Sequence, residues 1–117
     1  NAAEFLMEDL RYLKQEKVVV ILLDVKNEII KTVTVAIGGL SQSGVEAREI
    51  FKEPIKYSAS SIILAHNHPS GDPSPSDSDI VFTKRIYDAG KIFGIEVLDH
   101  IIIGNGIFSS LKKMGKF

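Results

Sequence analysis

Two histidines separated by a single residue are the feature of this sequence that best predicts chemistry. His66 and His68 follow a short apolar run that predicts a strand, so their imidazoles are expected to point to the same face. Asp79 can return to that face if the chain between makes a turn and begins a helix. Two imidazole nitrogens and one carboxylate suit zinc and leave a fourth tetrahedral position for water. The pattern therefore predicts a reactive zinc site rather than a purely structural one.

The residues around the histidine pair leave alternatives open. Asp72 and Asp77 compete with Asp79 as oxygen ligands by position. Asp79 would also lie in the first turn of its helix, where an aspartate commonly compensates the helix dipole. Ser76 suits the N-cap of the same helix, and its hydroxyl could instead stabilise the oxyanion that forms when a carbonyl is attacked.

A metal-activated water also needs a general base that is not itself a ligand. The candidates are glutamates on the predicted helix before the histidine strand, namely Glu46, Glu49 and Glu53. The residues alone do not choose among them, because a solvated glutamate on a helix is the ordinary case. The third histidine, His100, is expected to have a structural role.

The elements that must position these side chains alternate between strands and helices. Short β-branched runs predict strands, and apolar residues at helical spacing predict helices. The predicted strands span Val18–Leu23, Ile29–Ile37, Ser61–Ala65, Ile95–Leu98 and His100–Ile103, and the predicted helices span Ala3–Gln15, Val45–Tyr57 and Asp77–Phe93. This alternation predicts an α/β domain with a central mixed sheet flanked by helices.

Prolines and glycines mark the boundaries of these elements. Pro54 is expected to kink or shorten the second helix. Residues 69–75 contain three prolines and a glycine, so they predict a constrained loop. Gly94 is expected to end the third helix, and Asn105-Gly106 predicts a tight turn.

The bulk composition limits the classes of function. The chain has 117 residues, enough for a single domain, with 44% hydrophobic and 25% charged residues, as in a soluble globular protein. Cysteine is absent, which excludes disulfides, a cysteine nucleophile and the cysteine-ligated zinc site of deaminases. No apolar run has transmembrane length, so a cytoplasmic location is expected. Because the chain begins at Asn1 without a methionine, it is expected to be the C-terminal fragment of a longer protein.

These residues together resemble the JAMM (MPN+) metalloprotease domain, and specifically its bacterial RadC branch. The JAMM pattern is a glutamate upstream, then His-x-His, seven residues, a serine, two residues and an aspartate. It reads here as Glu49, His66, His68, Ser76 and Asp79. Further RadC-like features are the segments Arg48–Phe51, His66–Pro73 and Leu98–Gly104. The resemblance extends from roughly the first strand to the end of the chain and implies a JAMM/MPN-like, cytidine-deaminase-like fold.

The resemblance implies a zinc-dependent hydrolase of peptide or isopeptide bonds with one zinc per chain. The implied zinc ligands are His66, His68 and Asp79. Glu49 would deprotonate the zinc-bound water and later pass the proton to the leaving amine, and Ser76 would stabilise the oxyanion. Asn67 replaces the serine or threonine common in JAMM deubiquitinases, so a ubiquitin-type substrate is not implied. RadC relatives usually have a proline where this chain has Ala47, at the start of the helix.

Other functions remain as alternatives. The RadC name is tied to DNA repair, which suggests a protein that acts through nucleic acid or a protein partner. Direct nucleic-acid binding by this domain is not expected, because the net charge is −1 and no aromatic–basic stripe is present. A non-catalytic MPN module usually lacks the ligand set, and a metal-dependent nuclease favours more carboxylates. The partner is therefore expected to be a peptide or protein substrate, and the hairpin edge at Ile29-Ile30 could pair between chains of a homo-oligomer.

Overall fold

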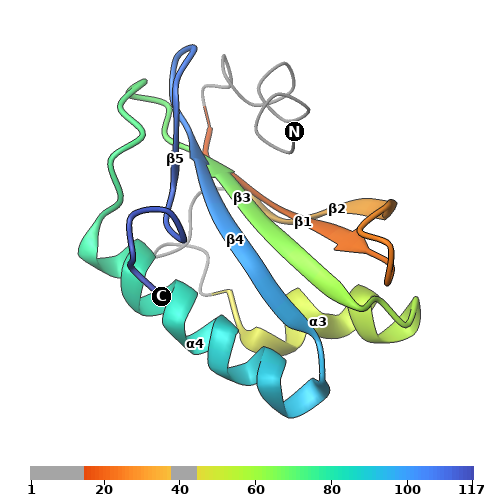
Figure 1. Ribbon diagram of the computed structural model, residues 1–117. Helices are drawn as coiled ribbons and strands as arrows, with labels where there is room; N and C mark the ends of the chain where they lie inside the picture. The colour runs from red at the N-terminus through yellow and green to blue at the C-terminus, as the bar shows by residue number, and fades with distance from the viewer. Residues whose placement is uncertain (1–14, 38–44) are drawn as a thin grey trace.

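The computed structural model of the chain describes residues 15–37 and 45–117, and a five-stranded sheet is its main element (Figure 1). The strands are β1 (Lys17–Leu23), β2 (Ile29–Ile37), β3 (Ser61–Asn67), β4 (Glu96–Ile103) and β5 (Phe108–Ser110), and the helices are α3 (Ala47–Lys56) and α4 (Asp77–Phe93). Their order in the sheet is β2-β1-β3-β4-β5. The predicted helix Ala3–Gln15 lies outside the described residues, except for Gln15 itself.

The sheet is mixed, which confirms the predicted α/β class. Strand β1 pairs antiparallel with β2 and β3, β3 pairs parallel with β4, and β4 pairs antiparallel with β5. Helix α4 makes the crossover that a parallel pair requires, because it connects β3 to β4. Among the described residues, no helix is both long enough and apolar enough to cross a membrane.

Both helices pack against the same face of the sheet (Figure 1). Ile50 and Phe51 of α3 and Ile86 of α4 are fully buried against alternate residues of β1 and β3. The intervening residues of these strands point to the opposite face, where they form a second apolar cluster with residues of β4. That cluster contains Val19, Ile21, Leu23, Ala65, Ile101 and Ile103. The wholly apolar sequence of β1 follows from its burial on both faces.

Four elements differ from their predicted bounds. Strand β1 begins at Lys17, one residue before its predicted start. Strand β3 continues through His66 to Asn67, so the first histidine lies within the strand rather than after it. The two strands predicted between Ile95 and Ile103 are one strand, β4, with a bulge at Leu98. Helix α3 is shorter than predicted and ends at Lys56, two residues after Pro54.

The pairing of β1 with β3 determines where the histidines lie. Because these strands are antiparallel, the start of β1 lies beside the end of β3, and Val18 pairs with His66. The residues immediately before β1 therefore meet the residues that follow β3. After the loop of residues 69–75, the start of α4 reaches the same end of these two strands.

Candidate metal centre

The two histidines and Asp79 converge at the end of β3. The Nε2 atoms of His66 and His68 are 3.0 Å apart. Asp79 Oδ1 lies 3.3 Å from His66 Nε2, and Asp79 Oδ2 lies 3.2 Å from His68 Nε2. Ligand atoms around a tetrahedral zinc are separated by about 3.3 Å, as follows from Zn–N bonds of about 2.0–2.1 Å. The spacing of these three side chains therefore fits a zinc ion.

Asp79 owes its position to the start of helix α4. Ser76 is the N-cap, where its hydroxyl accepts a hydrogen bond from Asp79 N–H at 3.1 Å, and Ser76 N–H donates to Asp79 Oδ2 at 2.8 Å. This reciprocal capping box requires the three-residue spacing that the motif has between its serine and its aspartate. Capping and ligand placement are thus compatible uses of one carboxylate.

The Asp79 carboxylate is ionised at neutral pH although it is 5% exposed. Its burial acts to raise the pKa, but the neighbouring imidazoles and Ser76 N–H outweigh burial and hold the pKa well below its usual range. The positive end of α4 favours the same charge state.

His68 is oriented by the proline-rich loop that follows it. Its Nδ1 lies 3.0 Å from the carbonyl oxygen of Asp72. A carbonyl can only accept, so Nδ1 carries a proton and the Nε2 lone pair of the neutral ring faces Asp79 and His66. The hydrogen bond with Asp79 raises the pKa of His68 despite the opposing effect of burial.

Glu16 is a site residue that the sequence analysis missed. Its Oε1 lies 3.9 Å from His68 Nε2, and its ligand atom is within 4.8 Å of those of both histidines. Glu16 directly precedes β1, so the antiparallel pairing of β1 with β3 brings it to the histidines. An acidic residue at the start of an apolar strand is the signal in the sequence, but that signal does not reveal which strand is its neighbour.

Asn67, between the two histidines, fixes the backbone on both sides of Glu16. Its Oδ1 accepts from Lys17 N–H at 2.7 Å, and its Nδ2 donates to the Gln15 carbonyl oxygen at 3.0 Å. The side chain is buried, with 1% exposure. The middle residue of His-Asn-His therefore positions the glutamate segment.

The structure does not bring the other predicted bases to the histidines. Glu49 is exposed, and its Oε2 accepts from Glu46 N–H at 3.2 Å in the capping box of α3. Glu46 Oε2 lies 3.8 Å from Arg85, and Glu53 Oε1 lies 3.8 Å from Lys31. Among the described residues, none of these three glutamates forms an ion pair with a histidine. The catalytic role of Glu49 stays a prediction.

The competing aspartates also lie elsewhere. Asp72 Oδ1 accepts hydrogen bonds from the backbone and the hydroxyl of Ser74, so its carboxylate stabilises the loop. Asp77 is exposed at the first residue of α4. Ser76 is exposed at the edge of the site, and its predicted contact with an oxyanion stays a prediction.

His100 lies behind the site on β4, and it is fully buried. Its Nε2 is 2.7 Å from His66 Nδ1, and its Nδ1 contacts the hydroxyl of Thr83 on α4. Burial lowers the pKa of His100 well below its usual range, so the ring is neutral. Its neighbour Asp99 accepts from His100 N–H, from the Ser110 hydroxyl and from Lys112 N–H, and thereby ties β4 to β5 and to the segment after it.

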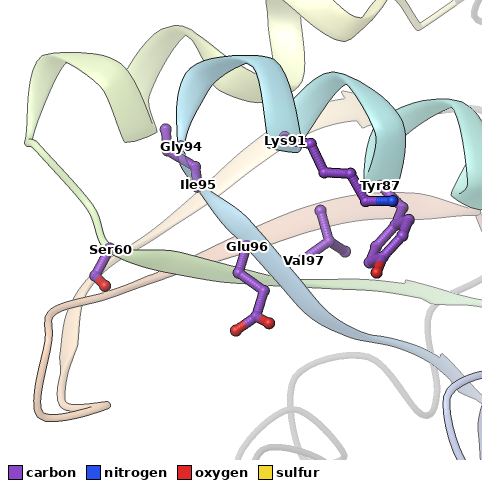
Figure 2. Close-up of a pocket in the computed structure, with 8 residues that line it drawn as sticks. Ser60, Tyr87, Lys91, Gly94, Ile95, Glu96 and Val97 are labelled. Carbon is purple, nitrogen blue, oxygen red and sulfur yellow. The ribbon is translucent and has the colours of Figure 1, made fainter.

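A separate surface pocket of about 410 Å³ lies between the end of α4 and the start of β4. Figure 2 shows Lys91 of α4 above Val97 of β4, with Tyr87 of α4 to the right of Val97. Lys91 Nζ is 4.4 Å from the centre of the Tyr87 ring. Ser60, immediately before β3, also lines this pocket. The pocket is therefore at the opposite end of β3 from His66, and it is not part of the metal centre.

Comparison with known proteins identifies the family of this chain. The family model of the RadC-like JAB domain matches residues 1–116. The chain is 55% identical over 117 residues to a UPF0758 protein of Shouchella clausii and 56% identical over 117 residues to one of Caldanaerobacter subterraneus. Each match covers all of this chain, but only 51% of the first relative and 50% of the second. The chain therefore spans about half the length of these relatives. These matches confirm the resemblance to RadC and show that the chain belongs to the RadC-like JAB domain family.

Proposed function

We propose that this domain is a zinc-dependent metallohydrolase that cleaves peptide or isopeptide amide bonds. The observation that carries the proposal is the convergence of His66 Nε2, His68 Nε2 and the Asp79 carboxylate, with separations of 3.0–3.3 Å. The JAB family includes zinc metallohydrolases in general, which supports the same reading. The chain spans only about half the length of its relatives. What a protein of that full length acts on is therefore also a matter of proposal.

The donor set supports zinc over calcium and magnesium. Two imidazole nitrogens and one carboxylate oxygen form a three-ligand set with one tetrahedral position free, whereas calcium and magnesium prefer sets made of oxygen. The lone pairs of three such groups repel one another at these distances unless a proton or a cation lies among them. The raised pKa of His68 is the response expected of the metal-free chain. A zinc ion held by these residues would supply Lewis acidity and lower the pKa of a coordinated water.

Glu16 is the general base that the geometry favours. Its carboxylate is 3.9 Å from His68 Nε2, farther than Asp79, so it borders the ligand set without completing it. A carboxylate at this position can accept a proton from the attacking water and return it to the leaving amine. Asn67 restrains the backbone on both sides of Glu16, which favours a fixed carboxylate.

Ser76 is the proposed oxyanion donor. Its oxygen accepts from Asp79 N–H, which leaves its hydroxyl proton free to donate. The side chain is exposed at the edge of the site, so a substrate carbonyl can approach it. A donor aimed at the developing oxyanion stabilises the transition state more than the ground state.

Metal analysis and a pair of glutamate variants test this proposal. Protein purified without chelator should contain about one zinc per chain. Glu16→Gln should keep the zinc but lose hydrolysis of a peptide library, because the amide cannot accept the proton. Glu49→Gln is the matched control. It makes the same substitution at the glutamate that the family resemblance implies as the base, and it should keep activity.

The outcomes separate the parts of the proposal. Loss of activity in Glu49→Gln but not in Glu16→Gln would return the base to Glu49. A chain that neither contains zinc nor takes it up would overturn the metal site. A zinc-loaded wild-type chain that hydrolyses no member of the library would leave a metal centre but refute the peptidase assignment for this domain.

A further inference from the structure

His66 and His68 are oriented by different partners. His68 donates from Nδ1 to a loop carbonyl, that of Asp72. His66 is buried to 1% exposure, and its Nδ1 faces a ring nitrogen, His100 Nε2, at 2.7 Å. A ring nitrogen can either donate or accept, so the contact alone leaves the tautomer of His66 undetermined.

The hydroxyl of Thr83 resolves this ambiguity. Thr83 has one hydroxyl proton, which it donates to the Asp79 carbonyl oxygen at 2.7 Å. Towards His100 the Thr83 oxygen can then only accept, so His100 Nδ1 carries a proton. The His100 side chain is fully buried, and its two ring nitrogens contact only His66 and Thr83 among the described residues, so a second ring proton would be a buried charge without an acidic hydrogen-bond partner on the ring.

The direction of each bond in the chain follows. His100 has its single ring proton on Nδ1, so its Nε2 accepts from His66 Nδ1–H. The proton of His66 is therefore on Nδ1, and its Nε2 presents a lone pair towards Asp79 and His68. Three contacts thus connect α4, β4 and β3 in turn. Thr83 on α4 contacts the Asp79 carbonyl oxygen and His100 on β4, and His100 contacts His66 on β3.

We propose that Thr83 and His100 form a positioning relay that fixes the tautomer and ring plane of His66, so that its Nε2 is held ready for a metal ion. The inference rests on the proposed metal site, and neither residue touches the ion. A histidine that binds a metal through Nε2 needs a partner for its other nitrogen, and loss of that partner lowers metal affinity about 10–100-fold.

A purely structural role makes a different prediction. Valine is nearly isosteric with threonine, so if Thr83 only fills space, Thr83→Val should leave the site unchanged. If the relay operates, His100 loses the acceptor for its Nδ1 proton and can hold its proton on Nε2 instead. It would then donate to His66 Nδ1, moving the His66 proton to Nε2 and blocking the position that a metal needs.

Long-range proton–nitrogen NMR correlation of the metal-free protein measures these tautomers directly. The chain has three histidines, so replacing them one at a time assigns the ring signals. Above the raised pKa of His68, wild-type protein should show His66 and His100 with their protons on Nδ1. In Thr83→Val, His66 should move toward the Nε2–H form, and zinc affinity in a chelator competition should fall about 10–100-fold.

Two further variants complete the test. His100→Gln can offer an amide oxygen to His66 Nδ1–H and should retain more zinc affinity than His100→Leu. Ser61→Ala is the control, because Ser61 has a buried hydroxyl on β3 that has no hydrogen-bond partner among the described residues. This variant should leave both the tautomers and the zinc affinity unchanged.

The relay is refuted if wild-type His66 carries its proton on Nε2, or if Thr83→Val changes neither the tautomer nor the affinity. Because the tautomers are measured without metal, failure of the relay is distinguishable from failure of the proposed function. A chain that binds no zinc but shows the predicted tautomers would refute the hydrolase proposal while supporting the hydrogen-bond chain.

Discussion

Gly104 is the residue whose replacement should best connect backbone packing with metal binding. It follows β4, and a Cβ atom at this position would lie 2.2 Å from the Gly71 carbonyl oxygen and 2.9 Å from Pro73 Cδ. Ordinary contacts of a Cβ atom begin at 3.4 Å. Gly104→Ala must therefore push the proline-rich loop away from the end of the sheet.

This displacement should reach the metal centre through the loop. The Gly71 carbonyl accepts from Asn105 N–H at 3.0 Å, and the next carbonyl, that of Asp72, accepts from His68 Nδ1–H at 3.0 Å. Overpacking of this kind lowers the free energy of unfolding by about 1–3 kcal/mol. Loss of the hydrogen bond that orients His68 should lower zinc affinity about 10–100-fold.

Urea unfolding and chelator competition for zinc measure the two effects, with Gly94→Ala as the matched control. Gly94 ends α4 at φ +70, and a Cβ atom there would meet nothing within 4 Å. Gly94→Ala should lower the free energy of unfolding by about 1–2 kcal/mol, because alanine is strained in the left-handed backbone conformation. Its zinc affinity should be unchanged. The reasoning fails if Gly104→Ala binds zinc as tightly as wild type, or if Gly94→Ala weakens zinc binding equally.

Three further predictions concern the residues around the site. Ser76→Ala should lower the free energy of unfolding in urea by about 1 kcal/mol through loss of the α4 cap, whereas Ser76→Asn should keep that stability and lose only the hydroxyl. In chelator-treated protein, the hydrogen bond with Asp79 raises the pKa of His68, so its contribution to stability is complete below the usual histidine pKa and is lost as the pH rises through the raised value. Unfolding measured across this range should show the decline in wild type and not in His68→Gln. Asn67→Leu removes two hydrogen bonds beside Glu16, which should cost about 1–3 kcal/mol and lower peptide hydrolysis at unchanged zinc content.

Elements whose ends carry local signals are predictable from the sequence. Helix α4 has the predicted bounds because Ser76 caps its first turn and Gly94 adopts the left-handed conformation that ends it. Strand β2 also has the predicted bounds, since the hairpin turn and the glycines after it delimit the run. The spacing between Ser76 and Asp79 is likewise local, because it is the spacing of a capping box.

Which residues of β4 face the helices is not predictable from the pattern of apolar residues. Val97 packs with the helices, whereas Leu98 and Ile101 pack on the opposite face. Regular alternation cannot give this arrangement, so the sequence predicts two strands. The bulge at Leu98 accommodates the extra residue and lets one strand continue.

The neighbours of the site are the part that only the tertiary structure reveals. Glu16 directly precedes β1 and His100 lies on β4, the two strands on either side of β3. A hydrophobic pattern predicts strands without their order in a sheet. The helix that supplies Asp79 is predictable, but the buried contact of its Thr83 with His100 depends on how that helix crosses the sheet.

The central place of β3 gives the two histidines different dynamic surroundings. Both edges of β3 are hydrogen-bonded, to β1 and to β4, so its amide protons should exchange with solvent only when the sheet itself opens. His66 is anchored in that slowest-exchanging segment, whereas His68 and Asp79 approach from a loop and a helix start at the rim. Openings confined to the segments of His68 and Asp79 should therefore be more frequent than opening of β3, so the site proposed for zinc should become exposed to solvent without unfolding of the strand that holds His66.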